Sequence, residues 1–192
     1  MGLSKVVFLD RDGTLNKDEG YVHKVEDFEL LPGVIQGLQL LKQDYLFFII
    51  TNQSGIGKKY YTEEEFREFN NRVILELKKN DIEIENTYFC PHVVEDNCVC
   101  RKPKTKFIQE ITSIYDIDLE NSWMIGDHPS DILFGMNAGC KTIYLLTGHG
   151  EKHFEELDEN NIKPTYIARS FMEAAHFIKD LNSPNTYKKS SK

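Results

Sequence analysis

The sequence predicts an α/β fold in which an open parallel sheet is covered by helices on both faces. Short apolar stretches rich in β-branched and aromatic residues alternate with longer segments of helical apolar spacing, and this alternation is typical of βαβ units. The first stretch, Val6 to Leu9, is apolar throughout, as expected for a strand buried on both faces. Strands are expected at 5–10, 45–51, 86–90, 122–126 and 142–146, with a weaker one at 165–168.

The segments between the strands are expected to form helices. The clearest is 62–79, where Thr62 can cap the first turn, Glu65 completes a capping box, and apolar residues recur at helical spacing from Phe66 to Leu77. A single domain over residues 1–182 and a mobile tail over 183–192 are expected. The predicted helices span 34–44, 62–79, 104–116, 129–138 and 170–181.

The composition is that of a globular chain. Of the 192 residues, 40% are hydrophobic and 28% are charged. The formal net charge of −8 opposes binding to a polyanionic duplex, so nucleic acid is not an expected partner. The longest apolar run, Tyr45 to Ile50, is too short to cross a bilayer, and Met1 to Lys5 lead straight into the first strand. No membrane partner and a cytoplasmic location are therefore expected.

Two aspartates stand directly after the first expected strand. Asp10 and Asp12 are two residues apart, so strand periodicity sends both side chains toward the same side. Like charges held this close repel, and such a pair persists only when a cation lies between the carboxylates or one of them is protonated. Taken alone, the segment is also consistent with an ordinary acidic turn.

Further polar residues stand at the ends of other expected strands and before a helix. Thr51 to Gly55 offer hydroxyls and backbone amides, Arg101 and Lys102 precede the helix expected at 104–116, and Gly126 to Asp131 contribute two more carboxylates. Open parallel sheets bind ligands beyond the carboxyl ends of their strands. These residues are therefore expected to meet in one pocket that holds a hard cation and a phosphate.

The combination of these segments resembles the four motifs of the haloacid dehalogenase superfamily of phosphotransferases. The motifs stand here as Asp10 to Thr14, Thr51, Lys102 and Gly126 to Asp131, and the resemblance spans about residues 5 to 150. The resemblance implies a Rossmann-like sheet and an enzyme that hydrolyses phosphomonoesters through an aspartyl-phosphate.

The same resemblance implies catalytic roles for the motif residues. Asp10 is expected to attack phosphorus, and Asp12 is expected to act first as general acid and then as general base. Thr51, Lys102 and the backbone amide of Asn52 are expected to stabilise the charge on the phosphate oxygens.

The resemblance also implies a metal site. Mg²⁺ is the expected cofactor, held by the side chains of Asp10 and Asp127 and by the backbone carbonyl of Asp12. Asp131 is expected to lie one shell further out, where it orients Lys102 or a bound water.

A cluster of cysteines and a histidine follows the third expected strand. Three thiolates and an imidazole match a closed tetrahedral zinc site, and in a cytosolic chain such a cluster favours metal over disulfide. Scattered buried thiols are the alternative explanation, and Cys140 is better explained as a core thiol. Because four protein ligands leave no open position, a structural Zn²⁺ that stiffens this small loop is expected. The predicted ligands are Cys90, His92, Cys98 and Cys100.

Within the superfamily, the cysteine loop and first motif look like the branch that removes the 7-phosphate of D-glycero-D-manno-heptose 1,7-bisphosphate. This branch lacks a large cap domain, and short loops are then expected to select the substrate. Arg101 is expected to hold the phosphate that does not react. Two positions depart from the branch, with His128 in place of Lys and Lys58 in place of Arg. Expected substrate contacts are Asp18, Glu19, Gly20, Tyr21, Thr51, Asn52, Gln53, Ser54, Arg101, Lys102 and His128.

Other functions stay open on the sequence alone. The substrate class is a small phosphorylated compound, with a sugar bisphosphate first and histidinol phosphate or a broader range of sugar phosphates as alternatives. A non-catalytic, zinc-stabilised binding module and a phosphoryl or nucleotide transferase are the competing classes. The P-loop pattern Gly-x-x-x-x-Gly-Lys-Ser/Thr is missing from the sequence, which argues against a P-loop enzyme.

Overall fold

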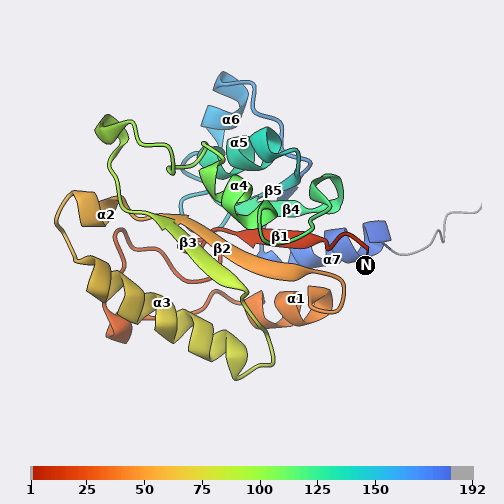
Figure 1. The fold of residues 1–192 in the computed structure, drawn as a ribbon, viewed down its shortest axis with the longest axis horizontal. Coiled ribbons are helices and arrows are strands. Elements are labelled where there is room, and N and C mark those ends of the chain that lie inside the picture. Colours follow the sequence, from red (N-terminus) through yellow and green to blue (C-terminus); the bar gives the residue numbers. More distant parts are fainter. Residues whose placement is uncertain (1, 183–192) are drawn as a thin grey trace, which may run out of the picture.

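A six-stranded parallel sheet forms the centre of the computed structural model, which describes residues 2–182 (Figure 1). The strand order is β3-β2-β1-β4-β5-β6, so the chain reverses its direction of travel across the sheet after β3. The α/β class predicted from the sequence is confirmed, and the order is that of a doubly wound fold. The strands are β1 (Val6–Leu9), β2 (Leu46–Asn52), β3 (Asn86–Cys90), β4 (Trp123–Gly126), β5 (Lys141–Leu145) and β6 (Tyr166–Ala168).

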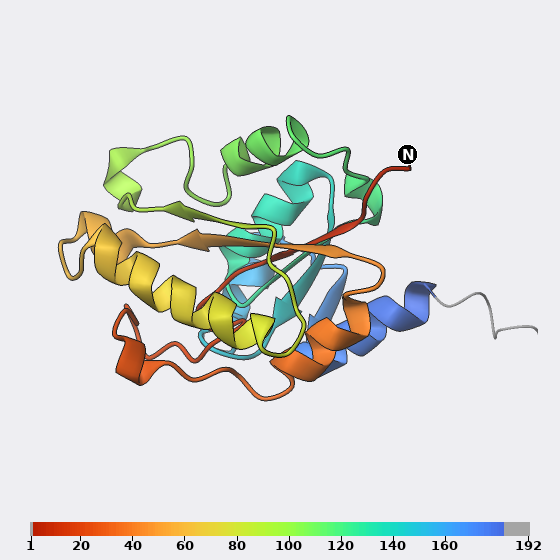
Figure 2. The same ribbon diagram turned by 60° about the horizontal axis from the view of Figure 1, so that its bottom comes forward.

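Helices cover both faces of the sheet, with α1, α3 and α7 on one side and α4, α5 and α6 on the other (Figures 1 and 2). The helices are α1 (Val34–Leu41), α2 (Ser54–Gly57), α3 (Glu63–Lys78), α4 (Lys106–Thr112), α5 (Pro129–Ala138), α6 (Glu155–Glu159) and α7 (Phe171–Asn182). Three 3₁₀ turns complete the chain at Val25–Asp27, Val94–Asp96 and Leu119–Asn121.

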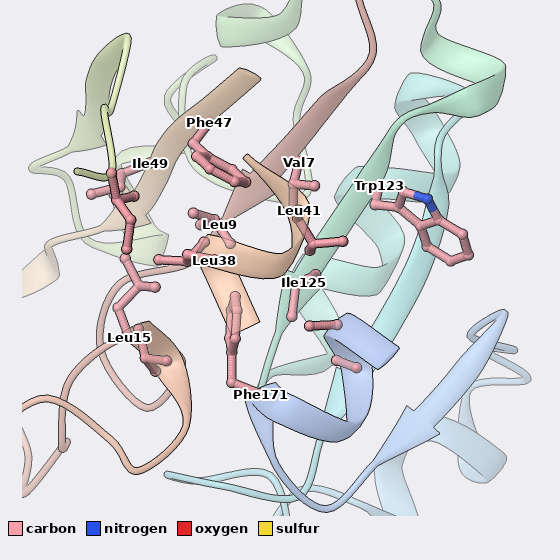
Figure 3. Packing of buried hydrophobic residues seen from close by; sticks show 14 of the residues in the cluster. Val7, Leu9, Leu15, Leu38, Leu41, Phe47, Ile49, Trp123, Ile125 and Phe171 are labelled. Carbon is pink, nitrogen blue, oxygen red and sulfur yellow. The ribbon is translucent and has the colours of Figure 1, made fainter. Parts of the chain in front are cut away.

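Strand periodicity divides the core into two layers. Val7 and Leu9 of β1 pack toward α1, α3 and α7, as Figure 3 shows for the larger layer. Val6 and Phe8 point the opposite way, toward α4 and α5. All four side chains are fully buried. Burial of each such apolar side chain contributes about 1.5–3 kcal/mol, which fixes the register of β1 and therefore the position of the residues that follow it.

Several element boundaries differ from the predicted ones. The helix expected over 104–116 ends at Thr112, and the helix expected over 34–44 ends at Leu41. The short helices α2 and α6 were not predicted, because four or five residues are too few to show helical periodicity. The tail predicted at 183–192 lies outside the described residues. Among residues 2–182, no helix has the length and apolarity required to cross a membrane.

Candidate active site

Three carboxylates converge where β1 and β4 end side by side. The pairing of Leu9 with Ile125 places Asp10 opposite Gly126, and the amide of Asp10 donates to the carbonyl of Ile125 at 3.0 Å. Asp127 follows directly, and α5 brings in Asp131 from its first turn. Each of the three aspartates offers an oxygen within 4.8 Å of those of the other two. The structure therefore brings together Asp10 of the first motif and both aspartates of the last motif.

Lys102 joins two of these carboxylates. Its Nζ donates to Oδ1 of Asp10 and to the carbonyl of Ile50, both at 2.7 Å, and lies 2.7 Å from Oδ1 of Asp131. The ammonium is thus held by three oxygens in a buried position. Asp131 thus lies beside Lys102 and within the same cluster as Asp10 and Asp127.

The three carboxylates carry more negative charge than the ammonium of Lys102 can neutralise. Burial raises the pKa of Asp10 to about 6, although the neighbouring Lys102 ammonium opposes the shift. Burial also raises the pKa of Asp127 well above its ordinary value, and the charges of Asp10 and Asp131 add to that effect. A hard divalent cation bound by these oxygens would relieve the repulsion, so the donor set fits Mg²⁺.

Two glycines allow the strand ends to approach this closely. Gly13 has a φ of +77°, and a Cβ on it would lie 2.2 Å from Oδ2 of Asp127. A Cβ on Gly126 would lie 2.2 Å from Oδ2 of Asp131. Any side chain at either position would displace a carboxylate of the cluster, which gives a physical reason for both motif glycines.

The side chain of Asp12 lies outside the carboxylate cluster and is held by hydrogen-bond donors. Arg11 donates to it through Nε at 3.0 Å and Nη2 at 2.8 Å, and Asn16 and Gln53 donate at 3.0 and 2.8 Å. Arg11 is itself only 1% exposed, with its guanidinium over the rings of Phe66 and Phe69 in α3. These contacts fix the orientation of the Asp12 carboxylate.

The residues after β2 have distinct orientations. The Thr51 hydroxyl accepts from Nε2 of Gln53 at 2.8 Å, which leaves its own proton for a ligand. The Asn52 side chain binds the backbone of Lys102 in both directions, accepting from its amide at 3.0 Å and donating to its carbonyl at 3.4 Å. Asn52 therefore fixes the segment that carries Lys102.

A cavity of about 420 Å³ opens above these groups, and most of the predicted site residues line it. Of the predicted catalytic and substrate-binding residues, only Glu19 is missing from its lining; it is exposed and lines a separate groove. Gln53 lines the cavity, but its side chain is buried and bound to Asp12 and Thr51. The predicted residues in the lining are Asp10, Asp12, Asp18, Gly20, Tyr21, Thr51, Asn52, Gln53, Ser54, Arg101, Lys102, Asp127, His128 and Asp131.

The sequence analysis missed five lining residues. Three come from the loop after β5, namely His149, Lys152 and His153, and the others are Tyr61 and Ser130. The strand-end rule would have found the loop, had it been applied to the fifth strand as well as the earlier ones. Burial lowers the pKa of His128 to about 4, with a contribution from the neighbouring His153, so its imidazole is neutral near pH 7.

The four predicted zinc ligands also lie together. The Cys90 and Cys100 sulfurs are 3.2 Å apart, the Cys98 sulfur lies 3.5 Å from that of Cys90, and His92 Nδ1 lies 3.3 Å from the sulfur of Cys100. In a tetrahedral site with Zn–S bonds of about 2.3 Å, neighbouring sulfurs are about 3.8 Å apart. The geometry and the donor set therefore fit a small tetrahedral metal site.

Comparison with known proteins agrees with this geometry. A family model described as "HAD-hyrolase-like" matches residues 99–174. The D-glycero-alpha-D-manno-heptose-1,7-bisphosphate 7-phosphatase of Campylobacter jejuni is 42% identical over 144 residues, which cover 74% of this chain and 83% of the relative. The D-glycero-beta-D-manno-heptose-1,7-bisphosphate 7-phosphatase of Pasteurella multocida is 35% identical over 190 residues, covering 94% of this chain and 100% of the relative.

A solved structure is similar over nearly the whole chain. The D,D-heptose 1,7-bisphosphate phosphatase of B. bronchiseptica, crystallised with magnesium and phosphate, matches with a TM-score of 0.83 and 27% identity. The match covers 92% of this chain and 99% of that one. Fold and site thus define a hydrolase with the haloacid dehalogenase-like fold. More narrowly, the chain belongs to the family of heptose 1,7-bisphosphate 7-phosphatases.

The crowded carboxylates predict how stability depends on pH in the metal-free protein. Because the folded-state pKa of Asp127 is raised, its stabilising contribution is complete below pH 4 and is lost as the pH rises through the folded-state value. The variant Asp127→Asn is therefore expected to have a higher Tm than the wild type without Mg²⁺ at pH 8, by at least about 3 °C, and a smaller difference at pH 5.5. Thermal unfolding in EDTA-free, Mg²⁺-depleted buffer measures this difference.

A Tm difference between the two proteins that stays constant from pH 5.5 to 8 would contradict the prediction. As a control, Asp158→Asn removes an exposed carboxylate from α6, and its Tm is expected to equal that of the wild type at each pH. Adding Mg²⁺ at pH 8 should raise the Tm of the wild type and not that of Asp127→Asn.

Proposed function

We propose that this protein is a Mg²⁺-dependent phosphatase that removes the 7-phosphate of D-glycero-D-manno-heptose 1,7-bisphosphate through an aspartyl-phosphate. The observation that carries the proposal is the convergence of Asp10, Asp127 and Asp131 beside Lys102, in a chain whose relatives are named for this reaction. The aspartates and the lysine belong to the set of groups that phosphoryl transfer needs, namely a nucleophile and fixed positive charge.

In the first step of the proposed mechanism, Asp10 attacks phosphorus. Lys102 holds Oδ1 of Asp10, so Oδ2 is the oxygen that forms the new bond. As the bond from phosphorus to the sugar oxygen breaks, Asp12 gives its proton to the departing alkoxide. Mg²⁺ bound by Asp10 and Asp127 would supply charge neutralisation for the phosphate oxygens. The Thr51 hydroxyl can donate its free proton to one of the remaining oxygens, and the positive charge of Lys102, whose N–H groups face Asp10, Ile50 and Asp131, stabilises them electrostatically.

In the second step, water attacks the phosphorus of the aspartyl-phosphate and Asp12 accepts its proton. The bond from phosphorus to Asp10 then breaks, so phosphate leaves and the carboxylate is restored. Arg11 and Gln53 hold the Asp12 carboxylate in one orientation, so the same group can serve both steps.

A substrate panel tests the proposed function. Values of kcat/KM are compared for both anomers of the heptose bisphosphate, histidinol phosphate and simple sugar monophosphates, because relatives are named for each anomer. One heptose bisphosphate anomer is expected to exceed every monophosphate by at least about tenfold. Equal values across the panel would indicate a general phosphatase, and no phosphate release from any compound would favour a binding module.

We propose further that Cys90, His92, Cys98 and Cys100 hold a structural Zn²⁺. The site joins the end of β3 to the segment that carries Arg101 and Lys102, and Arg101 also donates to the carbonyl of His92 at 3.3 Å. A metal bound by four protein groups would stiffen this segment without taking part in the reaction.

Metal analysis and one cysteine variant test the zinc site. The purified protein is expected to contain about one zinc per chain. Cys98→Ser is expected to lose the zinc and to unfold at a Tm at least about 5 °C lower, because metal binding and folding are coupled. Cys140→Ser, which alters a thiol outside the cluster, is the matched control and should keep its zinc. Reduced protein without zinc would contradict the assignment.

A further inference from the structure

The loop after β5 lines part of the cavity and is fixed at Thr147, His149 and Gly150. Thr147 donates its hydroxyl to the carbonyl of Gly13 at 2.6 Å, and the amide of His149 donates to Oδ2 of Asp127 at 2.8 Å. Further along, the carbonyl of Gly150 accepts from the hydroxyl of Tyr144 at 2.9 Å. Lys152 and His153 follow after Glu151 and line the cavity, so they come directly after the anchored part of the loop.

The floor of the cavity has no positive charge to spare for a second phosphate. Five carboxylates line it, from Asp10, Asp12, Asp18, Asp127 and Asp131, and the cations Lys102 and Arg11 are bound to three of them. With Asp12 protonated, as the proposed mechanism requires, the other four carry four negative charges, which Lys102, Arg11 and a divalent cation would together neutralise before a substrate enters. A dianionic group at the far end of a substrate must therefore be matched by charges on the rim.

Lys152 is a cation that lines the cavity, and within residues 2–182 no hydrogen bond or ion pair reaches its ammonium, although the Glu156 carboxylate interacts with it electrostatically. Arg101 is the other rim cation, and its guanidinium makes one bond to a backbone carbonyl. Two single positive charges, one from each side chain, equal the charge of one phosphate dianion.

Two histidines, His128 and His153, line the same cavity as Lys152. The amide of Ser130 donates to Nδ1 of His128 at 3.2 Å, so the neutral ring carries its proton on Nε2 and can donate from there. Nδ1 of His153 lies 2.5 Å from Oε1 of Glu156, which fixes the second ring. The two ring centroids are 4.7 Å apart. Their Nε2 atoms have no hydrogen-bond partner in the described part of the chain.

We propose that Lys152, His153 and His128 form a subsite that binds the non-reacting phosphate of a sugar bisphosphate, together with Arg101. This inference rests on the proposed function, and it adds the loop after β5 to the residues that select the substrate. It also gives His128 a role, because its Nε2 can donate a hydrogen bond while Lys152 supplies charge from the loop after β5.

The test compares substrates that differ only in the second phosphate. For Lys152→Ala, kcat/KM on heptose 1,7-bisphosphate is expected to fall about 10- to 100-fold through KM, with kcat nearly unchanged. On heptose 7-phosphate the same variant should stay within about threefold of the wild type. His153→Gln is expected to show the same selective loss on the bisphosphate, with a smaller fall in kcat/KM. Lys163→Ala, which removes a lysine that does not line the cavity, is the matched control.

Equal losses on both substrates, or no loss on either, would overturn the subsite. A binding measurement separates this result from failure of the proposed function, because it needs no turnover. Calorimetry with fructose 1,6-bisphosphate and fructose 6-phosphate should show tighter binding of the bisphosphate to the wild type and loss of that advantage in Lys152→Ala. If the wild type binds both sugars equally, the subsite is wrong whatever the panel shows; if it prefers the bisphosphate but hydrolyses no heptose, only the proposed function fails.

Discussion

Asp10→Asn is expected to lower phosphate release by about four to six orders of magnitude, the range seen when a hydrolase loses its nucleophile. An amide oxygen is a poor nucleophile and cannot form the aspartyl-phosphate. The fold should survive the change, because Oδ1 of Asn can still accept the hydrogen bond that Lys102 donates to Asp10 at 2.7 Å. Phosphate release under saturating substrate and Mg²⁺ measures the effect.

The Tm of Asp10→Asn shows whether the variant loses activity because it lacks the proposed nucleophile or because it unfolds. Since burial raises the pKa of Asp10 to about 6, the charged group is unfavourable in the metal-free protein at neutral pH. Asp10→Asn is therefore expected to unfold at a Tm no lower than that of the wild type without metal. Retention of near wild-type turnover would show that another group attacks phosphorus, and Asp158→Asn again serves as the exposed control.

Much of the fold could be predicted from the sequence because its strands are apolar and its longer helices are periodic. The strand expected at 86–90 and the helix expected at 129–138 coincide with β3 and α5. Helix ends were less predictable, since tertiary packing decides where a helix stops. Ile111 is fully buried while Ile114 is exposed, and the chain leaves the α4 axis between them.

From the sequence alone, only those site residues that belong to short local motifs could be predicted. Asp10, Lys102 and Asp127 stand out because each belongs to a short pattern at a strand end or beside a proline. Arg11 does not, because its position depends on the rings of Phe66 and Phe69, more than fifty residues away in the chain. Likewise, Lys152 lines the cavity because tertiary contacts hold the loop after β5 in place, and these contacts are not evident from the sequence.

Lys102→Met is expected to cost both stability and activity. The side chain is 2% exposed and its ammonium lies 2.7 Å from oxygens of Asp10, Ile50 and Asp131. Although burial alone would lower the pKa of Lys102, the two carboxylates raise it, so the cation is firmly held. Removing it leaves two buried carboxylates without their counter-charge, at a cost of about 3–5 kcal/mol. The Tm should fall by at least about 6 °C, and kcat by about 10²–10³.

The double variant Lys102→Met with Asp131→Asn shows whether the stability loss arises from unpaired charge. Asp131 is 1% exposed, and Asn there removes one of the carboxylates that the lysine neutralised. The double variant is therefore expected to recover at least about half of the lost free energy of unfolding, because neighbouring charges are not additive. Its kcat should stay as low as that of the single variant, since the proposed role of Lys102 is to stabilise the charge of the phosphate directly. Recovery of activity along with stability would mean that Lys102 acts on Asp131 alone and has no role at the phosphate.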